Sequence, residues 1–172
     1  MTRLVADQSA AQEILSLKRR IEELETQISE NERTAPSGSE VLAQGDETIV
    51  VHFSYQDDRM RYLDGEDSFS WNGIVSTLGP ILLNPASEDQ LKIKLGEAFA
   101  NRHRDKNRAT IYDADPRDED FQKIKIQLRA LGLIREFRSQ SDEGKHNKQW
   151  VLTFQGAQLM TQVAAIRSSA RD

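Results

Sequence analysis

Histidine and cysteine, two side chains that often perform catalysis, are few or absent in this sequence. There is no cysteine, which excludes disulfides, thiolate metal sites and thiol catalysis and fits a reducing compartment. The three histidines, His52, His103 and His146, are widely separated. The motifs that cradle phosphates or expose a nucleophilic serine (GxxxxGKS/T, GxGxxG and GxSxG) do not occur. We therefore expect a protein that is not an enzyme and needs no cofactor.

A group of carboxylates in the second half of the chain is the feature closest to a metal site. Its members are Asp113, Asp115, Asp118, Glu119 and Asp120. The group lacks the glycine and the ligand spacing of a calcium-binding loop. Carboxylates at 118–120 also suit the positive end of a helix dipole. We expect a helix start here and no metal.

Charge is distributed unevenly along the 172 residues, although the net charge is only −5. Residues 1–91 carry 7 basic and 17 acidic side chains, whereas residues 92–148 carry 14 basic and 10 acidic ones. A polyanion would bind the basic middle of the chain. The excess of four positive charges there is modest, and many surfaces with such an excess bind nothing anionic.

The first helix expected from the sequence has the pattern of a coiled coil. Between Ala10 and Glu32 the apolar residues follow the 3-4-3-4 spacing of a heptad seam: Ile14, Leu17, Ile21, Leu24 and Ile28. Isoleucine at a and leucine at d favour a parallel two-stranded coil. In such a coil Glu13 faces Lys18 and Arg20 faces Glu25 of the partner, and both pairs attract. The alternative is an amphipathic helix that packs on its own domain.

We predict that residues 1–33 form a dimerisation helix. Its seam covers little more than two heptads, so it would dimerise weakly without a second contact. The run from Thr34 to Ser39 contains proline, glycine and serine, which cannot continue a helix. Residues 34–46 are therefore predicted to be a flexible linker, and residues 47–172 a compact domain.

The domain is expected to open with a β-hairpin. From residue 49 to 55 one face carries Ile49, Val51, Phe53 and Tyr55 and the other carries Val50, His52 and Ser54, as in a half-buried strand. Asp64-Gly65 is a turn signal, and the return strand should end near Phe69.

Three helices should follow the hairpin. The first has helical spacing from Trp71 to Leu82 and should bend or stop at Gly79-Pro80. A capping box at Ser87 to Gln90 starts the second. The third runs from Asp118 to Gly132, with a buried stripe of Phe121, Ile124, Leu128 and Leu131. Arg102 to Arg117 is expected to be a polar linker in which Ile111-Tyr112 could form a short strand.

Two further strands and a helix complete the expected order. Ile134 to Ser139 and Gln149 to Phe154 are predicted strands, separated by a polar loop from Gln140 to Lys148. Thr153 is a candidate cap for a last helix.

Three helices followed by a two-stranded wing resemble a winged helix-turn-helix domain. Phe121 to Ile134 looks like a recognition helix running into its wing, and Trp150 to Gly156 resembles the strand-to-helix ending of such domains. The expected fold class is thus α+β: an N-terminal coiled-coil helix followed by a winged-helix domain with an added β-hairpin. The linker before the third helix is longer than the usual 3–4 residues, which leaves the angle of that helix open.

A closer likeness extends over nearly the whole chain. It rests on Ala6-Asp7-Gln8 with the heptad helix, Val50 to Tyr55, Trp71-Asn72, Ala86-Ser87-Glu88 and Asp118 to Ile134. This combination is similar to the C-terminal region of a bacterial family of unknown function whose members carry a TIR-like, Rossmann-type domain at the N-terminus. The resemblance implies the accessory or sensing part of a larger protein.

Two functions compete for the domain, and the first, nucleic-acid binding, is slightly preferred. It would use the outer face of the third helix, the wing and the basic run at 102–108, because glutamine, lysine and arginine contact base edges and phosphates. The candidate residues are Gln122, Lys123, Ile126, Arg129, Arg102, Arg104, Lys145 and Lys148. Double-stranded DNA is the expected ligand.

The alternative is a protein-interaction or assembly module centred on Ile126. The overall acidity and the carboxylates at 118–120 favour it, because they repel phosphates. In either case we expect a cytoplasmic protein, since no apolar run is long enough to span a membrane.

Overall fold

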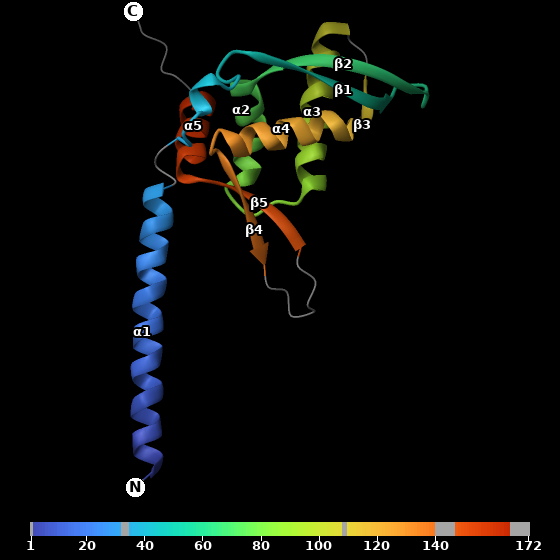
Figure 1. Cartoon of the computed structure of the whole chain (residues 1–172). Helices are drawn as coiled ribbons and strands as arrows, with labels where there is room; N and C mark the ends of the chain where they lie inside the picture. The colour runs from blue at the N-terminus through green and yellow to red at the C-terminus, as the bar shows by residue number, and fades with distance from the viewer. Residues whose placement is uncertain (1, 32–34, 108–109, 140–146, 166–172) are drawn as a thin grey trace, which may run out of the picture. The chain divides into compact units, whose positions relative to one another are not determined.

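The computed structural model describes residues 2–31, 35–107, 110–139 and 147–165. They form five α-helices, one short 3-10 helix and two small antiparallel sheets, so this is a mixed α+β protein (Figure 1). The chain divides into two compact units, Met1–Thr34 and Ala35–Asp172. The first unit contains the single helix α1 (Thr2–Asn31). No helix in the described part of the chain is long and apolar enough to cross a membrane.

The predicted hairpin is confirmed and belongs to a three-stranded sheet, but the turn indicated at Asp64-Gly65 is wrong. Both residues lie within the return strand, opposite Ser54 and Phe53. The chain turns earlier, where the Asp57 carboxylate accepts hydrogen bonds from the backbone N–H groups of Arg59 and Arg61.

Strands β1 (Thr48–Gln56) and β2 (Tyr62–Ser70) pair antiparallel, with Ile49 opposite Phe69. A third strand, β3 (Tyr112–Pro116), pairs with the other edge of β1, which gives the order β2-β1-β3. Because side chains alternate along a strand, one face of this sheet is buried and the other faces solvent.

The main core lies between the inner face of this sheet and the helices. Phe53 of β1 stacks on Phe99 of the helix α3 (Glu88–Asn107), with ring centroids 4.2 Å apart. Phe69 of β2 lies 6.0 Å from Phe53, and all three rings are buried. Burial of such aromatic side chains contributes about 1.5–3 kcal/mol each. The alternating apolar pattern therefore predicted the correct inward face of the hairpin.

The helix α2 (Trp71–Leu82) begins where the sequence indicates but does not stop at Gly79-Pro80. The predicted stop is wrong, because the helix continues to Leu82, which is buried in the core. Proline removes only one backbone hydrogen bond when it lies in the last turn. At Gly79 a side chain would overlap Met160, so glycine here permits close helix packing.

The capping box before α3 is confirmed. The Ser87 hydroxyl accepts a hydrogen bond from the Gln90 backbone N–H, and the Gln90 side chain accepts one from the Ser87 backbone N–H. These two bonds satisfy backbone groups that have no partner within a helix.

The polar linker expected from Arg102 to Arg117 is mostly regular structure. Helix α3 continues to Asn107, and the short strand suggested at Ile111-Tyr112 exists as β3. The expected loop around Arg102 and Arg104 is therefore wrong. Helix and strand are kept in register by close packing, since any side chain at Gly96 would overlap the Ala114 backbone oxygen.

The helix α4 (Asp118–Ala130) and the β-ribbon after it agree with the sequence analysis. Phe121, Ile124 and Leu128 are buried, and Gly132 has the left-handed φ of +70° that ends the helix. Strands β4 (Ile134–Ser139) and β5 (Asn147–Leu152) form the second sheet.

The last strand differs from its predicted range, because the chain leaves β5 after Leu152. Thr153 caps the helix α5 (Phe154–Ala164) by accepting a hydrogen bond from Gly156 N–H, so Phe154 belongs to the helix. Lys148, expected in the wing loop, lies in β5. An isolated antiparallel bridge joins Ala86, between α2 and α3, to Trp150 of β5.

Part of the segment expected to be a flexible linker packs on the second unit. Residues Ser39–Val41 form the 3-10 helix η1, and Leu42 packs against the core. The Gln127 side chain of α4 donates a hydrogen bond of 2.7 Å to the Ala43 carbonyl. The described residues from 35 onward therefore belong to the compact unit.

Candidate interaction surfaces

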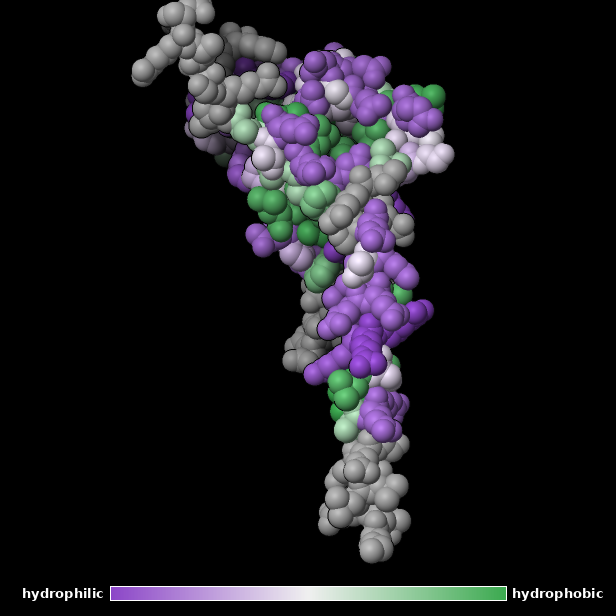
Figure 2. Space-filling view, turned by 90° about the vertical axis from the view of Figure 1, so that its left-hand side faces the viewer, coloured by the Kyte–Doolittle hydropathy of each residue, from purple (hydrophilic) through white to green (hydrophobic). Residues whose placement is uncertain are grey.

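Helix α1 exposes the apolar stripe that the heptad pattern predicts. In the single chain Ile14, Leu17, Ile21, Leu24 and Ile28 are each between 41% and 56% exposed. Figure 2 shows hydrophobic atoms between hydrophilic ones along this helix. Arg20 forms an ion pair with Glu23 of its own helix at 3.2 Å. An apolar stripe of this length normally lies against another surface.

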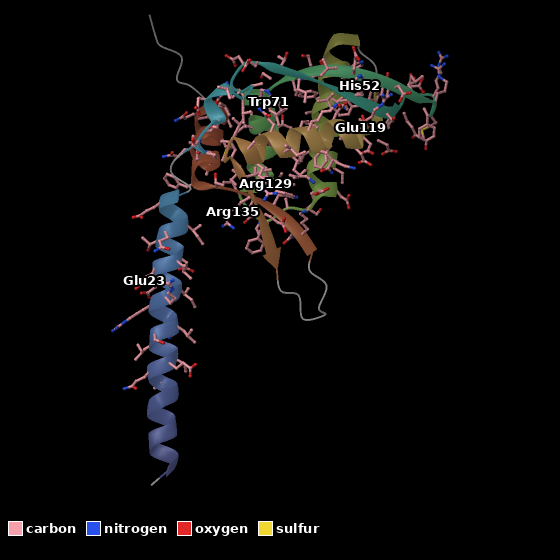
Figure 3. The ribbon with its side chains drawn as sticks, in the orientation of Figure 1. Glu23, His52, Trp71, Glu119, Arg129 and Arg135 are labelled. Atoms are coloured by element: carbon pink, nitrogen blue, oxygen red, sulfur yellow. The ribbon has the colours of Figure 1, made fainter. Side chains whose placement is uncertain are left out.

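The outward face of α4 is mixed in character. Lys123, Ile126, Arg129 and Ala130 are exposed there, and the side chain of Ile126 is 65% exposed. Glu119 lies near the start of the helix and Arg129 near its end, and Arg135 follows on β4 (Figure 3). Carboxylates therefore gather at one end of α4 and arginines at the other.

Glu88, the first residue of α3, connects three elements through its carboxylate. It accepts hydrogen bonds from Lys125 Nζ at 2.5 Å, from Trp150 Nε1 at 3.3 Å and from Gln122 Nε2 at 3.5 Å. Burial of Glu88 favours a higher pKa, but these donors outweigh it and lower the pKa below its usual value. Glu88 thus ties α3 to α4 and to β5.

A second charged cluster joins the three-stranded sheet to α4. The buried Asp120 carboxylate accepts hydrogen bonds from the backbone N–H of His52 at 3.0 Å and from its ring Nδ1 at 2.7 Å. Lys123 Nζ lies 3.1 Å from its other oxygen. Burial would raise the pKa of Asp120, but these contacts lower it to about 2. The ionised carboxylate only accepts, so Nδ1 of His52 carries a proton.

The other ring nitrogen of His52 points to a second carboxylate. Glu66 on β2 lies 3.3 Å from Nε2, directly across the strand pair from His52. The carboxylates of Asp120 and Glu66 therefore contact opposite nitrogens of the His52 ring, so these three side chains are not arranged to bind a single metal ion together. Among the described residues no group of three or more His, Cys, Asp or Glu side chains is placed to hold a metal.

Several of the predicted nucleic-acid contacts are already engaged within the chain. Gln122 bonds Glu88, Lys123 pairs with Asp120, and Lys148 lies 3.4 Å from Glu136 and over the Trp150 ring. Arg129 differs, because it is exposed and forms no ion pair with the described residues. Lys145 lies outside the described residues.

The two arginines predicted in the basic run lie on α3, away from the outward face of α4. Arg102 donates to the Ser68 carbonyl at 2.8 Å, pairs with Asp67 at 3.3 Å and lies over the Phe69 ring. Arg102 therefore joins α3 to strand β2 of the hairpin. Arg104 is exposed and lines a groove of about 430 Å³ between α3 and β3, together with Asp113. The structure does not bring these two residues together with Lys123 and Arg129 into one surface.

Sequence reasoning missed both carboxylate clusters. The sequence indicates Ser87-Glu88 only as a helix start and as part of a family resemblance, and it indicates His52 only as one of three widely separated histidines, in a predicted strand. Asp120 is 68 residues from His52 in the sequence, so no local pattern connects them. The pairing of Lys123 with Asp120 could be predicted from the sequence, because residues three apart are neighbours on a helix.

Comparison with known protein families, curated proteins and solved structures finds no match for this chain.

Proposed function

We propose that this chain is a non-catalytic dimerising module. In this proposal α1 forms a parallel two-stranded coiled coil, the unit from Ala35 is a winged-helix domain, and the outward face of α4 docks a protein partner. The likeness to the bacterial family with a TIR-like domain would make it the accessory or sensing part of a larger cytoplasmic protein.

The coiled coil is supported by agreement between pattern and exposure. Five seam residues are exposed in the single chain, although isoleucine and leucine are usually buried. Their spacing is that of positions a and d, and isoleucine at a with leucine at d suits two parallel strands. Association would remove this stripe from water.

The winged-helix assignment is supported by the order and pairing of the elements. Helices α2, α3 and α4 are followed by the ribbon β4-β5, and the Ala86–Trp150 bridge joins the α2–α3 connection to that ribbon. The insertion of β3 between α3 and α4 departs from the usual short turn. This strand ties the start of α4 to the added hairpin through β1.

The single observation that favours a protein partner is the composition of the outward face of α4. Its centre is the exposed Ile126, and the neighbouring Lys123 is already neutralised by Asp120. Contact with phosphates would require such pairs to be shared or broken. An apolar centre with a charged rim is typical of protein interfaces.

Nucleic-acid binding remains the second candidate, because Arg129 is exposed without an ion-pair partner in the described part of the chain. The test is fluorescence anisotropy of a labelled random-sequence duplex and single strand at about 50 and 200 mM salt. We expect no binding at either salt concentration. Binding that falls steeply with salt, and that Lys123→Ala and Arg129→Ala weaken, would replace the protein-partner proposal.

The α4 surface is tested directly by using the wild-type chain and two matched variants as bait to capture the protein partner. Ile126→Asp should abolish capture of the partner, whereas Ile93→Asp, at an isoleucine 59% exposed on α3, should not. Equal loss in both variants, or in neither, would show that the α4 surface is not the docking site. Thermal unfolding of each variant checks that the fold is intact.

A further inference from the structure

Helix α5 has an outward face of unusual composition. None of the residues Phe154–Ala164 is charged, although 30% of the whole chain is. Its inner side packs on α2, where Met160 lies against Gly79. Phe154, Gln158, Thr161 and Gln162 are exposed on the outside. Figure 2 looks onto the side of the molecule where α5 lies in Figure 1.

Two hollows adjoin this face. One is an open depression of about 380 Å³ along α5 itself, lined by Phe154, Ala157, Gln158, Thr161 and Gln162. The other, about 250 Å³, lies between α5 and the start of the unit and shares Gln158 and Gln162 with the first. The side-chain oxygen of Gln155 is buried in its lining and accepts no hydrogen bond from the described residues.

The second hollow also contains Ala35, the first residue of the compact unit. The outward face of α5 is therefore next to the point at which the chain enters this unit. Only three residues separate Asn31, the last residue of α1, from Ala35. Four peptide steps reach about 14 Å at most.

In a parallel coiled coil both chains leave from the same end of the coil, about 10 Å apart. The two copies of Ala35 would then lie within roughly 40 Å of each other. Since the α5 face adjoins Ala35 in each copy, it is well placed to meet its equivalent. This step rests on the proposed coiled coil.

We propose that the outward face of α5 pairs with the same face of a second copy of this chain, around the two-fold axis of the coiled-coil dimer. A face without charge suits self-association in a chain of net charge −5, because two identical charged patches would repel. Glutamine amides both donate and accept, so two identical rows of glutamine can bond to each other.

The two contacts support each other energetically. A seam of little more than two heptads is marginal alone, and so is a face of about five residues on one helix. When the coil forms, the tethered α5 faces experience an effective concentration on the order of millimolar. Each weak interface then stabilises the other without any additional contact.

The absence of cysteine allows a clean cross-linking test on the full chain. Single cysteines are introduced at Gln158, Thr161 or Gln162 on α5, at Leu24 in the coil, or at Tyr62 on the outer face of the sheet, which is 80% exposed. Mild oxidation links two cysteines only when their Cα atoms come within about 7 Å. We expect rapid cross-linking from Leu24→Cys and from at least one α5 position, and little from Tyr62→Cys.

The outcomes separate this inference from the proposed function. Cross-linking from Leu24→Cys but from none of the three α5 positions would overturn the pairing through α5 and leave the coil standing. Cross-linking from α5 alone would overturn the coil, and with it the pairing about the axis of a coiled-coil dimer, and would leave only a contact between α5 faces. Cross-linking from neither site would overturn both proposals. If Tyr62→Cys cross-linked as fast as the α5 variants, their links would reflect collisions, and the α5 pairing would fall.

A second measurement uses charge instead of cysteine. Gln158→Glu with Gln162→Glu places four added negative charges on the paired faces of a dimer. We expect the dimer dissociation constant from sedimentation equilibrium to rise at least 10-fold. The matched control, Gln12→Glu with Gln90→Glu, makes the same chemical change at exposed positions outside both interfaces and should change it less than 2-fold. Equal dissociation constants for the two double variants would overturn the inference.

Discussion

Helices α1 and α4 both expose apolar side chains, but their relation to the rest of the protein differs. Five of the six large apolar residues exposed on the described part of α1 form one stripe at heptad spacing, and only Leu15 lies outside it. In α4 the stripe Phe121, Ile124 and Leu128 is buried in its own domain, and Ile126 is the one large apolar side chain exposed on the described helix. We infer that the folding of α1 depends on association, whereas α4 is folded before any partner binds.

The largest effect expected from this difference is in α1. Ile21→Asp places a carboxylate in the proposed seam, and burial of an unpaired charge is strongly unfavourable. The dimer should dissociate fully at micromolar concentration, with a loss of helix signal in circular dichroism because the isolated helix is marginal. Light scattering measures the mass of the dimer, and circular dichroism measures the helix content. An unchanged mass would contradict dimerisation through the heptad seam. A monomer that keeps its full helix content would contradict the inference that the folding of α1 depends on association.

The next largest effect should come from the contacts that hold α4 in place. Glu88→Ala leaves the nearly buried ammonium of Lys125 and the indole N–H of Trp150 without their acceptor. We expect a loss of about 2–3 kcal/mol in the free energy of unfolding, measured with urea. Glu88→Gln keeps one acceptor oxygen and should lose less. Equal losses in both variants would mean that the carboxylate charge, and not hydrogen bonding, holds these elements together.

A pH effect should arise at the contact between α4 and the sheet. The pKa of Asp120 is lowered to about 2 in the folded chain from 3.8, so its contribution is present above about pH 4 and is lost as the pH falls toward 2. Between pH 5 and pH 2 the wild type should lose about 2 kcal/mol more than Asp120→Asn. Parallel pH profiles for the two proteins would rule out this stabilisation.

The smallest effect on folding is expected at the outward face of α4. Ile126→Asp should change the unfolding free energy by less than about 0.5 kcal/mol, because the side chain is 65% exposed. Chemical denaturation provides the measurement. A loss of several kcal/mol would place Ile126 in a packed environment and remove the contrast with α1.

Local patterns in the sequence predicted the elements whose signals are complete within a few residues. The alternation from Ile49 to Tyr55, the capping box at Ser87 to Gln90 and the buried stripe of α4 all appear as expected. The exposure of Ile126 was also predictable from helical periodicity.

The features that were missed depend on partners far away in the sequence. Helix α3 continues to Asn107 because its inner face packs on the sheet and β3, whereas its own sequence is largely polar after Arg102. The pairing of β3 with β1 and the contact of His52 with Asp120 have no local signal. Among the candidate contacts, Arg102 appeared available for phosphate binding, but it is held by Asp67 and Ser68.

The central claim is that the chain associates through α1, and its solution mass tests this most directly. Light scattering of the unmodified 172-residue chain should give twice the chain mass of 19.6 kDa at micromolar concentration and should fall toward 19.6 kDa on dilution. A mass of 19.6 kDa at every concentration up to about 100 μM, a range in which weak interfaces associate, would contradict the account.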